Sequence, residues 1–84
     1  SNTYGQIYEV LRETFGTGAT SREEAALREA EEAIARVLAE GKPVELMPQN
    51  AYIRRRQHQL AQSYDLISHS RGKEPRRRVR IYRE

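Results

Sequence analysis

Asn50-Ala-Tyr-Ile-Arg-Arg-Arg-Gln-His-Gln-Leu-Ala-Gln-Ser-Tyr64 is the stretch around which this chain is organised. Asn50 is a good N-cap, so we expect a helix to begin after it. At about 100° per residue, one face of this helix carries the residues expected in the core, namely Ile53, Gln57, Leu60, Ala61 and Tyr64. Arg54 and His58 are four residues apart and stack one turn above the other beside that face. The stretch therefore predicts a helix with one buried face and an adjoining basic face.

The sequence after this helix predicts a β-hairpin. Residues 66–70 and 77–82 are expected to be antiparallel strands, joined by a turn at 71–75 that contains a glycine and a proline. In the second strand, Val79 and Ile81 should face the core. The alternate residues should point to the opposite face of the sheet: Arg78, Arg80 and Tyr82.

The sequence before Asn50 predicts a long helix and a short strand. Ser21 and Glu24 match a capping box, and Gly41 followed by Pro43 is a typical helix stop. The apolar stripe of this helix consists of Leu27, Ala30, Ile34, Val37 and Leu38. Its glutamates are expected to be solvated, and residues 44–47 to form a strand.

Residues 4–14 predict one more short helix, which Gly16 and Gly18 separate from the rest. We place a boundary near Thr20, with an N-terminal helix and linker at residues 1–20 and the main domain at residues 21–84. The expected order is ααβαββ, an α+β fold in which a small three-stranded sheet has helices packed on one face.

The composition suits a small binding domain better than an enzyme. The 84 residues are 37% hydrophobic and 32% charged, which allows a modest core. The absence of cysteine excludes disulfides, thiolate metal sites and cysteine nucleophiles. The two histidines lack zinc-type spacing, and no Gly-x-x-x-x-Gly-Lys-Ser/Thr phosphate loop occurs. We therefore expect no catalytic residue, metal or cofactor.

The chain is expected to be soluble and cytoplasmic, with no membrane partner. No apolar run reaches the roughly 18 residues that span a bilayer, and no signal-peptide core follows Ser1. The start without methionine suggests a fragment of a longer protein, or first residues that come from cloning.

The charge of the chain is unevenly distributed. Residues 1–43 carry five Lys/Arg and eight Asp/Glu, a formal charge of −3, whereas residues 44–84 carry ten and four, a formal charge of +6. Such a positive second half favours a phosphate backbone, then an anionic membrane surface, then an acidic protein. We expect the acidic helix to face away from a nucleic acid.

This basic half resembles a known family. The run Val44-Glu-Leu-Met-Pro-Gln-Asn-Ala-Tyr-Ile-Arg-Arg-Arg-Gln-His-Gln-Leu-Ala61, followed by Ser68-His-Ser-Arg-Gly72 and Glu74-Pro-Arg-Arg-Arg-Val-Arg-Ile81, is similar to the R-3-H domain, named for an arginine and a histidine separated by three residues. The resemblance covers about residues 25–82. It implies helices on a three-stranded sheet and binding of single-stranded nucleic acid, DNA or RNA, with little sequence preference. Arg54 and His58 carry over as the exposed signature pair.

A narrower resemblance concerns the rest of the protein. The context Asn50-Ala-Tyr-Ile-Arg-Arg55, after a helix rich in glutamate and alanine, looks like the C-terminal end of bacterial and plastid AAA-type ATPases that carry this domain. This implies an accessory domain of a larger ATPase, with the ATP-dependent motor domain outside this chain. A protein-interaction module that docks to an ATPase or another subunit is the alternative.

The candidate contacts follow from charge and shape. Arg54 can hold a phosphate with its planar fork, and His58 can bind a phosphate or a base, more strongly on acidification. Tyr52 is the best candidate for base stacking and Tyr82 is a weaker one, and Arg55 is a less certain phosphate contact. The alternative for the pair is a solvated arginine and a half-buried histidine. Basic residues cluster on and after the hairpin turn: Arg71, Lys73, Arg76, Arg77, Arg78 and Arg80. They form a phosphate track if the turn lies beside the helix, and otherwise protect an edge strand from aggregation. The candidate contacts among them are Arg71, Lys73, Arg77 and Arg78.

Overall fold

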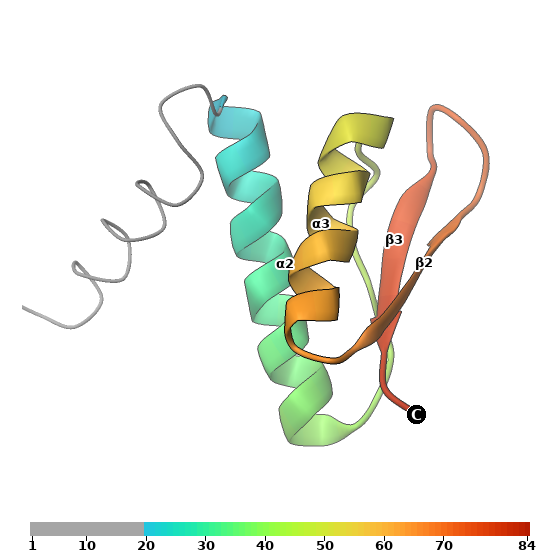
Figure 1. Ribbon diagram of the computed structural model, residues 1–84. Helices are drawn as coiled ribbons and strands as arrows, with labels where there is room; N and C mark the ends of the chain where they lie inside the picture. The colour runs from blue at the N-terminus through green and yellow to red at the C-terminus, as the bar shows by residue number, and fades with distance from the viewer. Residues whose placement is uncertain (1–19) are drawn as a thin grey trace, which may run out of the picture.

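The computed structural model describes residues 20–84, so the helix expected at residues 4–14 lies outside the described residues. The elements are α2 (Ser21–Glu40), β1 (Val44–Glu45), α3 (Ala51–Ser63), β2 (Ile67–Arg71) and β3 (Arg78–Tyr82). This αβαββ order confirms the predicted α+β class for the described part. The strands form one antiparallel sheet in the order β1-β3-β2, and both helices lie on the same side of it (Figure 1). The boundary near Thr20 stays a prediction.

Helix α2 starts and stops for local reasons. Its N-cap is Thr20 rather than the expected Ser21, because the extended backbone of Thr20 lets its Oγ1 accept the Glu23 amide at 3.0 Å. Its C-cap is Gly41, as expected, with a φ of 75° and an N–H that donates to the Val37 carbonyl at 2.8 Å. No helix between residues 20 and 84 is long and apolar enough to cross a membrane.

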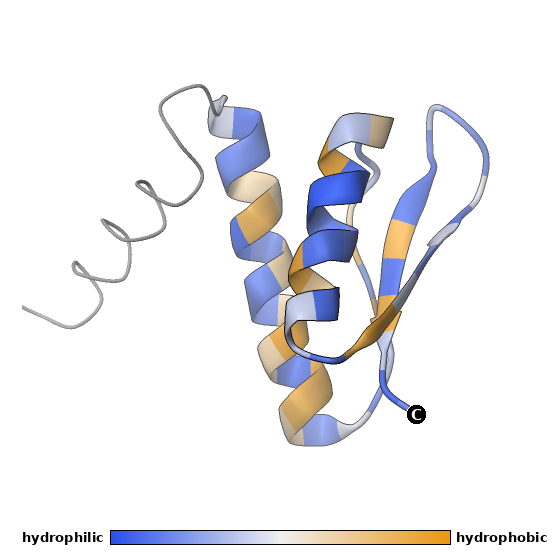
Figure 2. Cartoon of the chain, viewed as in Figure 1, coloured by the Kyte–Doolittle hydropathy of each residue, from blue (hydrophilic) through white to orange (hydrophobic). Residues whose placement is uncertain are grey.

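The core lies between the two helices and the inner face of the sheet. The central strand β3 contributes Val79 and Ile81, both fully buried as their alternation predicted. The remaining cluster members are Ala30, Ala33, Ile34, Val37, Leu46, Ala61 and Leu66. Figure 2 shows hydrophobic colour on the facing sides of the helices and hydrophilic colour over the turn between β2 and β3.

Two residues predicted to be in the core are exposed instead. Leu38 is 45% exposed, because Val37 points into the core and the next residue projects about 100° away. Tyr64 is 49% exposed, because it caps α3 with a φ of −104° and no longer follows the helical projection.

The hairpin of β2 and β3 forms as predicted, and its register decides which side chains share a face. Ser68 pairs with Ile81, and Ser70 with Val79. Paired residues point to the same side of a sheet, so both serines lie on the core side, toward α3. Gly72 in the turn has a φ of 86°, a conformation that favours glycine.

Strand β1 is shorter than the predicted residues 44–47. The amide of Leu46 still donates to the Val79 carbonyl at 2.8 Å. The next amide, that of Met47, points away from β3 and donates to Glu29 Oε2 of α2 at 2.9 Å. The chain then runs between α2 and the residue before β3, since the Gln49 amide donates to the Arg77 carbonyl at 3.3 Å.

Candidate functional site

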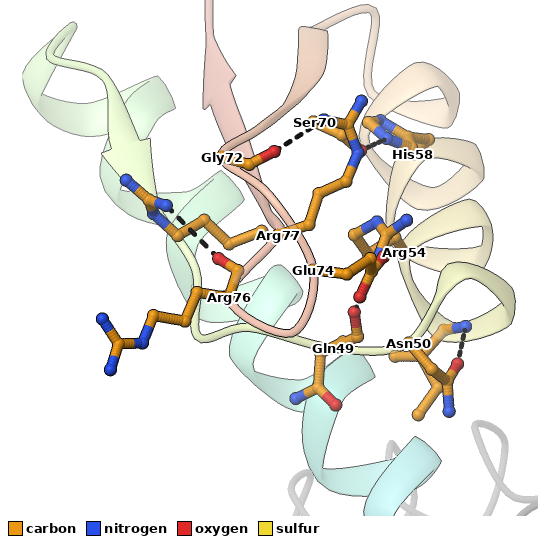
Figure 3. Close-up of polar contacts among 11 residues, drawn as sticks. Gln49, Asn50, Arg54, His58, Ser70, Gly72, Glu74, Arg76 and Arg77 are labelled. Carbon is orange, nitrogen blue, oxygen red and sulfur yellow. Dashed lines mark hydrogen bonds and ion pairs between the residues drawn. The ribbon is translucent and has the colours of Figure 1, made fainter.

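Helix α3 presents its signature residues to the hairpin because of where it begins. Asn50 is the N-cap, as predicted, and its Oδ1 accepts the Ile53 amide at 2.9 Å. Ile53 and Gln57 then face the core, and Arg54 and His58 face the turn and strand β2 (Figure 3). The side chains of Arg54 and His58 therefore lie between α3 and the hairpin.

Arg54 is not the exposed residue that the resemblance implies. It is 8% exposed, and its Nη1 donates to the Gln49 carbonyl at 2.6 Å and to Glu74 Oε1 at 2.9 Å. The guanidinium thus joins the start of α3 to the hairpin turn, as Figure 3 shows. Its charge is partly balanced by Glu74, whose side chain is 62% exposed.

His58 is half-buried and is held at both ring nitrogens. Nδ1 lies 2.7 Å from Ser68 Oγ, and Nε2 lies 2.9 Å from Ser70 Oγ. A neutral imidazole satisfies two hydroxyls, since one nitrogen donates and the other accepts. The pKa of His58 is lowered, first by burial and then by the positive charges of His69, Arg54 and Arg77. The ring is therefore neutral near pH 7.

An open depression of about 470 Å³ adjoins this histidine. Its lining residues come from the end of α3 and from β2: His58, Gln62, Leu66, Ser68, His69 and Ser70. Arg77 runs toward His58 and Ser70 in Figure 3, and its Nη1 donates to the Gly72 carbonyl at 2.8 Å. The one N–H of the neutral His58 ring is held by a serine, and the other ring nitrogen accepts from the second serine. The groups left to donate to an anion are the serine hydroxyl that accepts from His58, the His69 imidazole and the Arg77 guanidinium.

The other predicted contacts are distributed over several surfaces. Arg55 and Lys73 are exposed, and no carboxylate of residues 20–84 pairs with them or with Arg77. Tyr52 is 55% exposed, but its hydroxyl lies 3.4 Å from Glu23 Oε2, which turns the ring toward α2 and away from the depression.

The register also divides the predicted phosphate track. Arg71 pairs with Arg78, next to the inward pair Ser70 and Val79, so both arginines point to the outer face of the sheet. Arg78 Nε is also bound to Glu45 Oε1 at 2.7 Å. These two arginines therefore do not join a track beside α3, and Lys73 and Arg77 remain predicted contacts for it.

Three contributors were missed in the sequence. Ser68 and Ser70 could have been found, because a Ser-x-Ser pattern on a strand places both hydroxyls on one face. Glu74 carried no such signal, since it reaches Arg54 only through the path of the turn. Within residues 20–84, no three side chains of the metal-binding types come together to hold a metal ion.

The sequence of this chain is similar to those of known proteins over most of the described residues. Residues 24–83 match the sequence model of the R-3-H domain. The uncharacterized protein ycf45 of Porphyra purpurea, a plastid protein, is 48% identical over 60 residues. Those residues are 70% of this chain and 11% of that relative, so the chain spans about a tenth of the relative's length.

Proposed function

The chain belongs to the R-3-H domain family, whose members are generally modules that bind single-stranded nucleic acid, and we propose that this domain binds a single strand through phosphates, with little sequence preference. The observation that supports this most is the concentration of donors around one open depression. The hydroxyls of Ser68 and Ser70 line this depression, and Arg77, which has no carboxylate partner among residues 20–84, runs toward it (Figure 3). Lys73, in the hairpin turn, also has no carboxylate partner among these residues.

Each side chain has a distinct part in this proposal. Arg77 and Lys73 contact phosphates directly, and Arg55 adds charge from the exposed side of α3. Arg54 positions the turn that carries Lys73, through its bonds to Gln49 and Glu74. Contacts of this kind read the backbone and not the base edges, so the binding is expected to depend weakly on sequence.

The whole protein is proposed to be larger. The chain covers about a tenth of its relative, and the resemblance around Asn50 points to AAA-type ATPases. We place this domain as an accessory module that holds a single strand while an ATP-dependent motor domain elsewhere in the protein acts.

Salt-dependent binding of labelled oligothymidylate tests the proposal. For single strands, the slope of log affinity against log salt becomes shallower by about 0.7 for each phosphate that the protein no longer neutralises. Arg77→Gln should weaken binding and lower this slope by about 0.7. Arg28→Gln removes the same charge from an exposed position on α2 and should leave the slope unchanged.

Two results would overturn the proposal. One is a chain that binds no oligonucleotide even at low salt, which would favour the protein-interaction alternative. The other is an Arg77→Gln variant whose slope equals that of the Arg28→Gln control.

A further inference from the structure

The outer face of the sheet carries charges and rings that the α3 site does not use. Both helices lie on the other side, so no element between residues 20 and 84 covers this face (Figure 1). The register places these residues on it: Glu45, His69, Arg71, Arg78, Arg80 and Tyr82.

The arginines of this face are not fully balanced by acids. Arg71 and Arg78 are direct cross-strand partners, an arrangement of like charges that disfavours the pairing. Glu45 binds Arg78 at 2.7 Å, and no carboxylate of the described chain pairs with Arg71 or Arg80. The face therefore has an excess of positive charge that an anion would relieve.

Two aromatic rings of this face lie next to each other, tilted by 30°. The centroids of His69 and Tyr82 lie 5.8 Å apart, with 30° between the ring planes. The Arg80 Cζ lies 5.4 Å from the centroid of the Tyr82 ring. Rings and a guanidinium held in this way form a small platform on which a nucleobase can stack, beside arginines that can bind the flanking phosphates.

We infer that this outer face is a second binding surface for the single strand, on which one base stacks against His69 and Tyr82 while Arg80 and Arg71 contact phosphates. The inference rests on the proposed function for the choice of ligand. His69 also lines the depression beside His58, so it links the two surfaces around the exposed edge strand β2. A strand that follows this path contacts phosphates at Arg77 and stacks a base beyond the edge of the sheet.

An oligothymidylate of about ten nucleotides and an abasic oligonucleotide of the same length separate stacking from charge. Tyr82→Val keeps a residue that favours strands but removes the ring, and should weaken oligothymidylate binding about tenfold. The same variant should bind the abasic strand like the unmodified chain. Tyr82→Phe keeps the ring and should bind both strands normally. Arg80→Gln should weaken binding of the oligothymidylate and of the abasic strand, and more than the Arg28→Gln control does.

The thermal midpoint of each variant checks that it folds. The amide resonances of His69, Arg80 and Tyr82 report on the outer face and should shift when oligothymidylate is added. The inference is overturned if Tyr82→Val binds oligothymidylate as tightly as the unmodified chain, or if these amides do not shift while those around Arg77 do. Either of these two results would leave the proposed function intact. A chain that binds no strand would overturn both.

Discussion

Replacing Arg54 with alanine should lower the free energy of unfolding by about 3 kcal/mol, because this guanidinium binds the start of α3 to the hairpin turn. Its Nη1 donates to the Gln49 carbonyl at 2.6 Å from a site that is 8% exposed. Hydrogen bonds from charged groups contribute about 1.5–3 kcal/mol. The pair with Glu74 adds at most about 1 kcal/mol, since the Glu74 side chain is 62% exposed and solvent screens the interaction.

Urea denaturation followed by circular dichroism measures this loss. Arg55→Ala is the matched control, since Arg55 is the exposed neighbour on the same helix and its loss should change stability by no more than about 0.5 kcal/mol. Arg54→Lys keeps the charge but not the planar fork, and should fall between the two. Glu74→Gln combined with Arg54→Ala should give a coupling energy below about 1 kcal/mol.

The reasoning is refuted if Arg54→Ala unfolds at the same urea concentration as Arg55→Ala but binds oligonucleotide much more weakly. Arg54 would then act as a ligand contact, as the resemblance implied, and its bonds to Gln49 and Glu74 would have no energetic weight.

Three further predictions follow from the buried and strained positions. The pKa of His58 is lowered in the folded chain, so the unfolded state binds the proton more readily and stability should decrease as pH falls below about 6.5. Melting curves recorded across this pH range should lose the dependence in His58→Gln. They should keep a part of it in His69→Gln, because burial still lowers the pKa of His58 in that variant. Asp65 has a φ of 59°, so Asp65→Gly should raise the unfolding free energy by up to about 1 kcal/mol, and an Asp65→Ala variant of equal or greater stability would contradict this explanation. Gln57 is fully buried, its Nε2 donates to the Ala26 carbonyl at 3.0 Å, and its Oε1 has no partner among residues 20–84. In denaturant titrations, Gln57→Met should therefore change the free energy of unfolding by less than about 1.5 kcal/mol. Gln57→Ala leaves a cavity and should lower it by about 2–5 kcal/mol.

Much of the fold could be predicted because its causes are local. The Asn50 cap, the Gly41 stop and the alternation of Val79 and Ile81 depend on neighbouring residues, and each is confirmed. The errors occur where a local rule ends. Tyr64 leaves the helical projection at the cap, and β1 ends at Glu45, before the predicted Met47.

The sequence was sufficient to identify the family, the order of the described elements and the basic half of the chain, because these follow from the spacing and charge of residues along the chain. It was not sufficient to show the surroundings of the signature pair. Glu74 lies 20 residues from Arg54, and Ser70 lies 12 from His58, and only the folded hairpin brings them within hydrogen-bond distance. The strand register likewise decided that Arg71 and Arg78 point to the outer face of the sheet and not toward α3, because a shift of one residue reverses every side chain on a strand.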